Sequence, residues 1–274
     1  MNQFAFETWD SGKLTVNREF AETLRAAGLT AFDAIWNHTG GSIAKNLLKE
    51  RTTTRLSVRD REGTEQVFYL KRHTRPPFKE YIKPLLRLTW PILGARPEWD
   101  AILRFHSAGI ATMTPAALGE SGGRSFLLTA AIEGCRKLSH LMDAEHHSAE
   151  PESEQKKRTI VVSIAKAAQT MHAAGMHHQD FYLTHLMVPE SGRPDPLYVI
   201  DLGRVRHSDR LSRRWIVKDL AQLNYSAHHA SRSERLRFFR EYLGRPLTDA
   251  DRHLLRSIAR KSARIARHSR KNRL

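Results

Sequence analysis

Two aspartates, one in a loop after a predicted helix and one directly after a predicted strand, most constrain what this chain can fold into. Apolar residues recur at helical spacing through Ile160–Ala174, and the segment HHQDFYLTH, which contains Asp180, follows that pattern. The run Leu197–Ile200 is typical of a short buried strand, and Asp201 comes directly after it. The sequence therefore predicts a helix, a loop and a strand that carry two carboxylates to one place.

The spacing of these residues is typical of phosphoryl-transfer enzymes. Their catalytic loop reads H-R-D-x-x-x-x-N, where the aspartate takes the proton of the attacking hydroxyl and the last residue binds a metal ion. Asp180 has the position of that base, and His185 has the position of the metal ligand. The Asp201-Leu202-Gly203 motif has the position of D-F-G, whose aspartate also binds metal. Each motif alone is unspecific, but their order and local structure together predict a kinase.

The amino-terminal half contains a matching lysine and glutamate. Val67–Lys71 is an apolar run that ends in a lysine, like the strand whose lysine contacts the α- and β-phosphates of ATP. A helix is predicted from Pro97, because proline suits a first turn, and Glu98 in that turn is placed to pair with Lys71. The simpler interpretations are a solvated lysine at a strand end and a glutamate favoured by the helix dipole.

Backbone groups are expected to make the adenine contacts. Ser125–Ala131 is typical of a buried strand. The segment that begins at Thr129 and ends at Glu133 is then the predicted hinge, where adenine would hydrogen-bond to the main chain.

A glycine pair is the candidate for the loop that covers the phosphates. Gly40, Gly41 and Ser42 predict a turn, with flanking strands at Ala44–Leu48 and Thr52–Val58. No G-x-G-x-x-G is present, so a protein-kinase glycine loop is not supported. Gly40 and Gly41 are therefore predicted to contact the phosphates, and this prediction rests only on their tendency to form a turn.

The charge predicts an anionic partner. Lys and Arg number 45 against 29 acidic residues, which gives a net charge of +16 and a pI near 10.4. Nucleic acid, an acidic membrane and a phosphorylated glycolipid all fit such a charge. Near the carboxyl end, arginines recur at helical spacing beside apolar residues: Arg256, Arg260, Arg264 and Arg267. This pattern predicts a basic amphipathic helix, which is typical of proteins that bind a membrane surface. The alternative is a solvated tail.

Three longer stretches resemble the bacterial lipopolysaccharide core heptose kinase family, whose members have a protein-kinase-like fold. They are Leu85–Glu120, Met171–Val188, and the segment from Val199 (VIDLGRVR) through Ala227. The resemblance implies an α+β, two-lobed protein-kinase-like fold in a single domain, residues 1–274. The expected lobes are a small β-rich N-lobe at 36–132 and a larger, mainly helical C-lobe at 133–274 that contains the basic helix.

The resemblance also implies an activity: ATP-dependent phosphorylation of a sugar hydroxyl, that of an inner-core heptose of lipopolysaccharide. Asp180 would take the proton of that hydroxyl, while Asp201 and His185 would hold Mg²⁺. Histidine is a soft ligand for Mg²⁺, so Mn²⁺ is the alternative metal. Asp219 resembles the buried acid that supports the catalytic loop, and its simpler interpretation is a helix-surface acid.

The implied partners are lipopolysaccharide or another anionic glycolipid, the cytoplasmic membrane surface, and acyl carrier protein, on which family members can depend for folding. The sequence shows no secretory signal and no stretch of about 20 apolar residues, which predicts a cytoplasmic protein bound peripherally at the inner face of that membrane. Cys135 is the single cysteine, which excludes an internal disulfide. Gln179 stands where the family commonly has arginine, which argues against control by a phosphorylated activation loop.

Two other functions stay open. One is a related kinase with another acceptor, such as a Kdo sugar, a small molecule or a protein side chain. The other is a non-catalytic basic module that binds membrane or nucleic acid on a kinase fold. The sequence contains no helix-turn-helix, RNA-recognition or zinc-finger signature, which disfavours nucleic acid.

Overall fold

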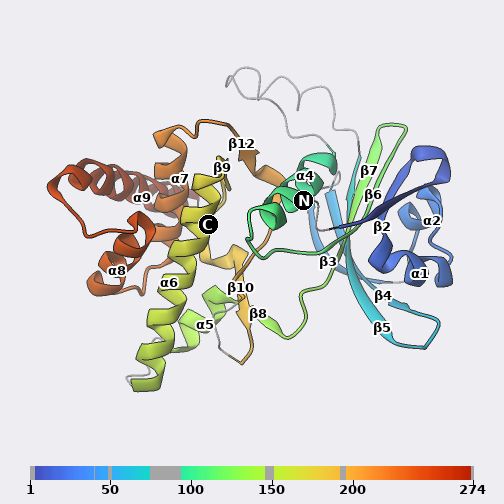
Figure 1. Cartoon of the computed structure of the whole chain (residues 1–274), viewed down its shortest axis with the longest axis horizontal. Helices are drawn as coiled ribbons and strands as arrows, with labels where there is room; N and C mark the ends of the chain where they lie inside the picture. Colours follow the sequence, from blue (N-terminus) through green and yellow to red (C-terminus); the bar gives the residue numbers. More distant parts are fainter. Residues whose placement is uncertain are drawn as a thin grey trace. The chain divides into compact units, whose positions relative to one another are not determined.

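The structure is a computed structural model that describes residues 4–39, 41–48, 51–74, 94–145, 151–191 and 196–272. The chain divides into two compact units. The first comprises Met1–Ser107 and Met113–Ile132, and the second comprises Ala108–Thr112 and Glu133–Leu274. Strands dominate the first unit and helices the second, so the predicted α+β class is confirmed (Figure 1).

An antiparallel sheet of seven strands forms the centre of the first unit (Figure 1). Its spatial order is β1-β2-β6-β7-β5-β4-β3, and every neighbouring pair is antiparallel. The strands are β1 (Phe6–Trp9), β2 (Leu14–Asn17), β3 (Gly41–Leu48), β4 (Arg51–Arg59), β5 (Glu65–His73), β6 (Pro115–Ser121) and β7 (Arg124–Ala130). The segment before residue 36, outside the predicted N-lobe, therefore supplies two strands of this sheet.

Among the described residues, the helices of the first unit are α1 (Arg18–Ala26), α2 (Phe32–Trp36) and α4 (Arg96–Ser107). A short 3-10 turn spans Asp10–Gly12. The first two helices share a core with alternate residues of the strands, where the Phe32 and Phe126 rings lie 5.3 Å apart. Helix α4 packs on β6 and β7. Because successive strand residues point to opposite faces, Leu127 faces away from the core that contains Phe126.

The turn predicted at the glycine pair is wrong. Gly41 and Ser42 begin strand β3, where they pair with Leu56 and Arg55 of β4. At the other end of these strands, Leu48 of β3 pairs with Arg51 of β4. Gly40 and residues 49–50 lie outside the described residues. A glycine pair marks a turn only by propensity, and here the pairing with β4 extends the strand across it.

The second unit is mainly helical (Figure 1). Its helices are α5 (Leu138–Glu145), α6 (Pro151–Ala173), α7 (Arg213–Ser226), α8 (Arg232–Leu243) and α9 (Arg252–Asn272). Its short strands are β8 (Cys135–Lys137), β9 (Met176–His177), β10 (Leu186–Pro189), β11 (Tyr198–Val199) and β12 (Arg206–His207). They form a β11-β10-β8 sheet and a β12-β9 pair, and 3-10 turns span Leu183–His185, Leu202–Arg204 and Asp249–Asp251.

The predicted helix at residues 160–174 is the second half of α6, which ends at Ala173. Gly175 follows with φ of +71°, a left-handed conformation that suits glycine. A Cβ at this position would also collide with the carbonyl oxygen of Ser208. The backbone can therefore turn sharply from α6 into the segment that contains Asp180.

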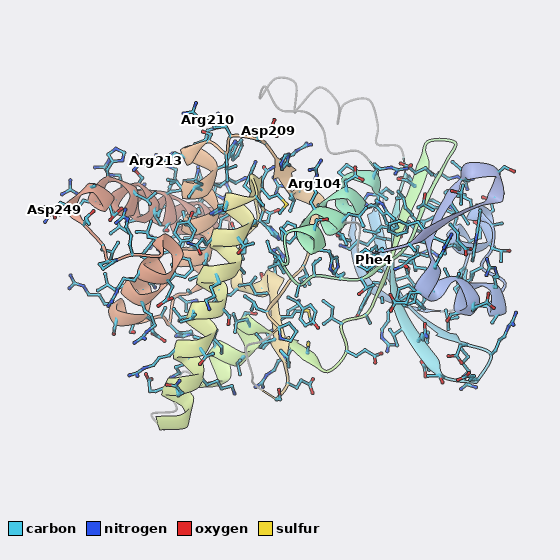
Figure 2. All side chains as sticks on the ribbon, in the orientation of Figure 1. Phe4, Arg104, Asp209, Arg210, Arg213 and Asp249 are labelled. Atoms are coloured by element: carbon cyan, nitrogen blue, oxygen red, sulfur yellow. The ribbon has the colours of Figure 1, made fainter. Side chains whose placement is uncertain are left out.

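The basic carboxyl-terminal segment forms helix α9, which packs along α7. Ile258 and Ser262 are buried at this contact, and the Ser262 hydroxyl donates to the carbonyl of Ala221. Near the start of both helices, Arg213 lies 2.9 Å from the His253 ring (Figure 2). The arginines at helical spacing are exposed. Among the described residues, no helix is both long and apolar enough to span a membrane.

Candidate active site

The loop that contains Asp180 is held by helix α7. Asp219 of that helix is fully buried, and its carboxylate accepts the backbone N–H groups of His178 (2.7 Å) and Gln179 (2.9 Å). Two charge-assisted bonds in a buried setting fix this turn of backbone, including the left-handed φ of +70° at Gln179. Asp219 therefore has the supporting position that the family resemblance implies, and the surface-acid interpretation is wrong.

Gln222 makes a second attachment that the sequence analysis missed. Its amide donates to the carbonyl of Gln179 (2.6 Å) and accepts the backbone N–H of Phe181 (3.2 Å). Residues three apart on a helix share a face, so Asp219 and Gln222 contact the loop from the same side of α7. That spacing is the signal from which this role could have been predicted.

His178 joins Asp180 to the residue that precedes Asp201. Its Nδ1 accepts the backbone N–H of Asp180 (3.3 Å), and its Nε2 donates to the carbonyl of Ile200 (3.0 Å). The ring is fully buried, and burial lowers its pKa, so it stays neutral in the tautomer that these two bonds require. The N–H of Ile200 also donates to the carbonyl of His185 (2.9 Å). The two aspartate segments are thus hydrogen-bonded to each other.

His177, one residue earlier, supports the loop by packing against an aromatic ring and not by hydrogen bonds of its side chain. Its ring stacks on Trp215 of α7, with centroids 4.4 Å apart. The side chain is buried, and this burial lowers its pKa to about 4. Both histidines therefore support the structure of the loop.

His185 and Asp201 have the geometry of a metal site. His185 Nδ1 lies 2.7 Å from the carbonyl oxygen of Asp180, and since a carbonyl only accepts, Nδ1 carries the proton. In the neutral ring Nε2 then presents a lone pair, 3.5 Å from the Asp201 carboxylate. Two acceptors facing each other are unfavourable unless a second proton or a cation lies there. A histidine that donates its other N–H to a carbonyl is also the usual arrangement for a metal ligand.

A single carboxylate and one histidine suffice for a metal that also binds nucleotide phosphates. Mg²⁺ is typically bound by one or two carboxylates, waters and substrate oxygens rather than by a complete protein cage. Consistent with this, the described residues contain no group of three or more His, Cys, Asp or Glu side chains arranged to hold a metal by themselves. The two residues present therefore fit the metal-phosphate arrangement of a kinase.

Arg204 is the other residue that the sequence analysis missed. It ends the 3-10 turn after Asp201, and its Nη1 contacts both carboxylate oxygens of Asp180, at 2.9 and 3.1 Å. Its carbonyl accepts the side-chain amide of Gln179 (2.8 Å). No motif in the sequence marks this contact, which arises because the loop and the turn meet in the fold.

The first unit contains the predicted lysine–glutamate pair. Lys71 of β5 and Glu98 of α4 form an ion pair with Nζ and Oε1 2.6 Å apart. Phe68 and Leu70 belong to the core beneath α1 and α2, so alternation directs Lys71 to the face on which α4 lies. Glu98 is 4% exposed, so the loss of Lys71 would leave a buried charge without this partner, which is more costly than breaking a surface pair.

The other predicted nucleotide-binding residues occupy different environments. Thr129 is buried in β7, while Glu133 is exposed after the strand ends. Between them, the backbone N–H groups of Ala130 and Ala131 already donate to Thr114 and Val67, so adenine cannot use these two groups without breaking those bonds. The adenine-binding role of this segment stays a prediction.

Gly41 lies away from Lys71 along the sheet. The register aligns Gly41 with Leu56 of β4 and thus with Phe68 of β5, whereas Lys71 aligns with Thr53. The end of the hairpin at Leu48 is nearer to Lys71 in this register, because Leu48 aligns with Arg51 and Arg51 with His73. The phosphate contacts of Gly40 and Gly41 stay predictions, and the position of Gly41 in the sheet does not support them.

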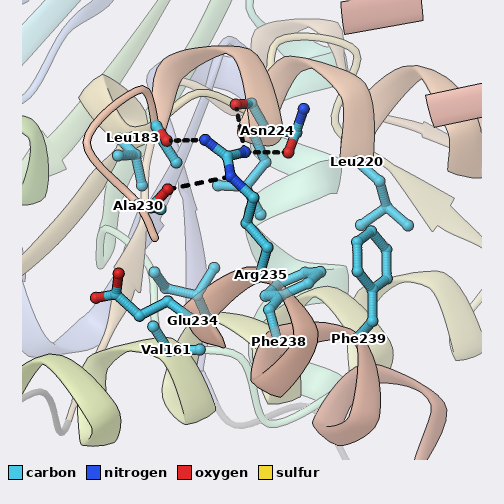
Figure 3. A pocket seen from close by; sticks show the side chains of 12 residues that line it. Val161, Leu183, Leu220, Asn224, Ala230, Glu234, Arg235, Phe238 and Phe239 are labelled. Atoms are coloured by element: carbon cyan, nitrogen blue, oxygen red, sulfur yellow. Dashed lines mark hydrogen bonds between the residues drawn. The ribbon is translucent and has the colours of Figure 1, made fainter. Parts of the chain in front are cut away.

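A separate apolar pocket lies among helices α6, α7 and α8 (Figure 3). Its lining includes Val161, Leu220 and Phe239, and Arg235 forms part of its wall. The Arg235 guanidinium donates to the carbonyls of Ala227 (2.7 Å) and Ala230 (3.2 Å) and contacts Asn224, so its donors are engaged by other residues of the pocket wall. Such a lining suits an apolar group rather than a nucleotide.

Comparison with protein families and relatives gives consistent matches. The family described as "Lipopolysaccharide kinase (Kdo/WaaP) family" matches residues 33–254. The lipopolysaccharide core heptose(I) kinase WaaP of Pseudomonas aeruginosa is 35% identical over 236 residues, covering 80% of this chain and 86% of the relative. A protein of the same name from Escherichia coli is 36% identical over 192 residues, covering 66% of this chain and 72% of the relative.

Solved structures agree. The structure described as "WaaP in complex with acyl carrier protein" superimposes with a TM-score of 0.71 and 31% identity, covering 92% of this chain and 98% of the other. An aminoglycoside-3'-phosphotransferase of type VIII has a TM-score of 0.50 and 14% identity, covering 88% and 98%. The second likeness shows the kinase-like fold alone.

Proposed function

The chain belongs to the lipopolysaccharide kinase (Kdo/WaaP) family, and from that premise we propose that it transfers the γ-phosphoryl group of ATP to a hydroxyl of an inner-core heptose of lipopolysaccharide. One observation carries the proposal most directly. His178 bonds to the backbone of Asp180 and of Ile200, so the base and the residue before Asp201 belong to one hydrogen-bonded assembly. Phosphoryl transfer needs such fixed positioning more than it needs covalent chemistry.

In this reaction a sugar hydroxyl oxygen forms a bond to the γ-phosphorus while the bond from that phosphorus to the β,γ-bridging oxygen breaks. Asp180 accepts the hydroxyl proton, and ADP leaves with the bridging oxygen. Lys71, held by Glu98, contacts the α- and β-phosphates. A divalent metal, held by Asp201 and His185, supplies positive charge to the phosphates when it is bound.

The metal is Mg²⁺ or Mn²⁺. Asp201 offers the oxygen that both ions accept, while the Nε2 lone pair of His185 is a softer donor that favours Mn²⁺ more than asparagine would. We assign Mg²⁺ as the working ion and Mn²⁺ as an effective substitute.

Acyl carrier protein is the proposed protein partner. A relative with 31% identity over 92% of this chain forms a complex with it, as that structure's description states. Co-expression of the chain with a tagged acyl carrier protein, followed by gel filtration, tests the partner: a stable complex supports it, and separate elution of two folded proteins contradicts it.

The inner face of the cytoplasmic membrane is the proposed place of work. The acceptor is lipid-anchored, and α9 exposes a row of arginines. Each cation near an anionic surface contributes about 1 kcal/mol of attraction. Flotation with anionic vesicles, compared with vesicles of neutral lipid, should show binding to the first only, and equal or no binding to both contradicts this location.

The deciding experiment is transfer of labelled γ-phosphate from ATP to purified lipopolysaccharide from which the core phosphates have been removed. Wild type should label the glycolipid, and Asp180→Ala should lower the rate about 10²- to 10⁴-fold, the usual contribution of a general base, while still binding ATP. The exposed Asp209→Asn is the matched control and should label like wild type (Figure 2). ATP binding without transfer by wild type would discard this acceptor, and no ATP binding by a folded protein would discard the kinase function.

A further inference from the structure

Cationic side chains gather beside Asp180 in excess of the carboxylates there. Arg204 contacts Asp180, and Lys218 of α7 approaches the same loop, with its Nζ 3.3 Å from the side-chain oxygen of Gln179. Burial and then the charge of Arg204 lower the pKa of Lys218, and Lys261 of α9 adds to this effect. Three like charges from separate elements therefore act on one another near the base.

The carboxylates near Lys218 are already engaged. Asp180 and Asp219 are the acids whose charge acts on Lys218. Asp180 accepts both contacts from Arg204, and Asp219 accepts two backbone N–H groups. Lys218 itself is half-buried, and its hydrogen bond goes to a neutral amide. Its Nζ also lies 5.5 Å from the centre of the Trp215 ring, which offers some cation–π attraction but no negative charge. A half-buried ammonium without a carboxylate in contact is costly to the fold, and a bound anion would offset that cost.

Arg204 also has donors left for such an anion. Its Nη1 is taken by Asp180, whereas its Nε and Nη2 contact no acceptor within the part of the chain that the structure describes. The side chain is 55% exposed. A guanidinium binds a carboxylate or phosphate through two parallel N–H groups, and one that remains attached to Asp180 would hold the anion next to the base.

Gln179 keeps this arrangement possible. Its side-chain amide donates to the main-chain carbonyl of Arg204, and its side-chain oxygen accepts from the Lys218 ammonium. An arginine at this position could not accept from Lys218 and would add a like charge beside it. The neutral side chain of Gln179 therefore lets Lys218 stay next to the loop, because it accepts a hydrogen bond from the ammonium and adds no positive charge.

We propose that Arg204 and Lys218 bind an oxyanion, a carboxylate or a phosphate, that the acceptor carries close to the hydroxyl that is phosphorylated. This inference rests on the proposed function and names its substrate class: an acidic sugar acceptor, bound by its own negative charge beside Asp180. Arg204 and Lys218 are acceptor-binding residues in this reading, and Gln179 positions them.

The test measures acceptor KM and kcat for wild type, Arg204→Gln and Lys218→Gln on three forms of the core glycolipid. The first form lacks only the phosphate that the reaction adds and keeps its sugar carboxylates and its other phosphates. The second has the carboxylates converted to neutral methylamides, and the third has the other phosphates removed. On the first form each variant should raise the acceptor KM about tenfold or more, the usual effect of losing a hydrogen bond to a charged group, with a smaller change in kcat and an unchanged KM for ATP.

The modified acceptors identify the anion. If it is a carboxylate, the methylamide form should raise the KM of wild type to that of the variants, and the variants should then lose nothing further. If it is a phosphate, the dephosphorylated form should behave in this way instead. Arg158→Gln, which removes an exposed charge near the start of α6, is the control and should match wild type on all forms.

Several results would overturn the inference while leaving the proposed function intact. They are equal KM losses for wild type and variants on both modified acceptors, a rise in the KM for ATP instead of the acceptor, or a loss in Arg158→Gln as large as in Arg204→Gln. Absence of transfer by wild type to the unmodified glycolipid would overturn the proposed function and the inference together. Melting temperatures of the variants check that each has folded.

Discussion

His178 donates from Nε2 to the carbonyl of Ile200, 3.0 Å away, while its Nδ1 accepts the backbone N–H of Asp180. Because both ring nitrogens are used and the ring is fully buried, one neutral histidine sets the spacing between the two aspartate segments. The role of this ring is geometric, because both of its nitrogens bond to the backbone next to Asp180 and Asp201.

His178→Phe should therefore lower both stability and turnover. Phenylalanine fills a similar volume but leaves a buried N–H and a buried C=O without partners, which costs about 1–3 kcal/mol for each group. We expect a lower melting temperature and a reduced kcat with little change in the KM for ATP. His140→Phe, at an exposed position of α5, is the control, and equal effects from both variants would contradict the role of His178.

Asp219→Asn tests how strongly α7 determines the catalytic loop. The asparagine oxygen can keep one of the two backbone N–H groups, but its amide hydrogens would face the other donor. The loss of one bond to a charged group should destabilise the fold by about 1.5–3 kcal/mol and lower kcat. Urea unfolding and steady-state kinetics measure the two effects, and Asp249→Asn, an exposed neighbour of α9, should change neither (Figure 2).

The Lys71–Glu98 pair should show opposite responses in stability and activity. Lys71→Met leaves Glu98 buried without its partner, which we expect to cost up to about 3 kcal/mol. The double variant Lys71→Met, Glu98→Leu removes both charges and should regain part of that stability. Activity should stay low in both, about 10²-fold below wild type, because the phosphates lose a charged contact.

Lys13→Met is the control for this pair, since Lys13 forms an exposed ion pair with Asp10 in the same unit. Such pairs contribute less than about 1 kcal/mol. If the double variant were no more stable than Lys71→Met, or if it regained activity, the proposed roles of the two residues would be wrong.

Stability should fall as the pH drops from about 6.5 to about 4, in part because of His177. Burial lowers the pKa of His177 to about 4 in the folded protein, whereas an unfolded histidine has a pKa of about 6.5. Between these values the unfolded chain binds the proton more readily, so acid favours unfolding; above pH 6.5 the stabilisation is fully present. His178, whose pKa is also lowered by burial, acts in the same direction.

Replacing His177 by phenylalanine keeps a ring against Trp215 and removes the titrating group. The free energy of unfolding of His177→Phe, measured in urea from pH 7 to pH 4, should therefore vary less with pH than that of wild type. Identical slopes in the two proteins would show that His177 does not titrate in this window.

Much of the site could be predicted from the sequence because its parts are local patterns. Asp180 and His185 are five residues apart in one loop, and Asp201 follows a recognisable strand. Lys71 and Glu98 are distant in sequence, yet each sits at a marked place in its own element, a strand end and a helix first turn. Local pattern and the order of elements were enough to single out these five residues, whose catalytic and binding roles stay predictions.

The remainder depends on contacts that no local pattern specifies. Arg204 reaches Asp180, and Gln222 reaches the loop, only because a turn and a helix meet it in three dimensions. The strand that begins at Gly41 is set by its pairing with Leu56, which outweighs the glycine signal for a turn. Sequence reasoning fails where strand register or a packing contact decides the outcome.

His185→Asn should shift metal preference toward Mg²⁺. His185 Nδ1 donates to the carbonyl of Asp180, and its Nε2 faces Asp201; an asparagine amide can keep a donor for that carbonyl while offering an oxygen to the metal. Since Mg²⁺ prefers oxygen ligands and Mn²⁺ accepts nitrogen more readily, the ratio of activity with Mg²⁺ to activity with Mn²⁺ should rise several-fold over wild type. Electron paramagnetic resonance of Mn²⁺ bound with ATP gives a second measurement that needs no turnover, and weaker Mn²⁺ binding is expected.

His253→Asn, on the exposed side of α9, is the control and should leave both measurements unchanged. An unchanged metal ratio in His185→Asn, together with unchanged Mn²⁺ binding, would mean that His185 only braces the loop and that Asp201 holds the ion without it.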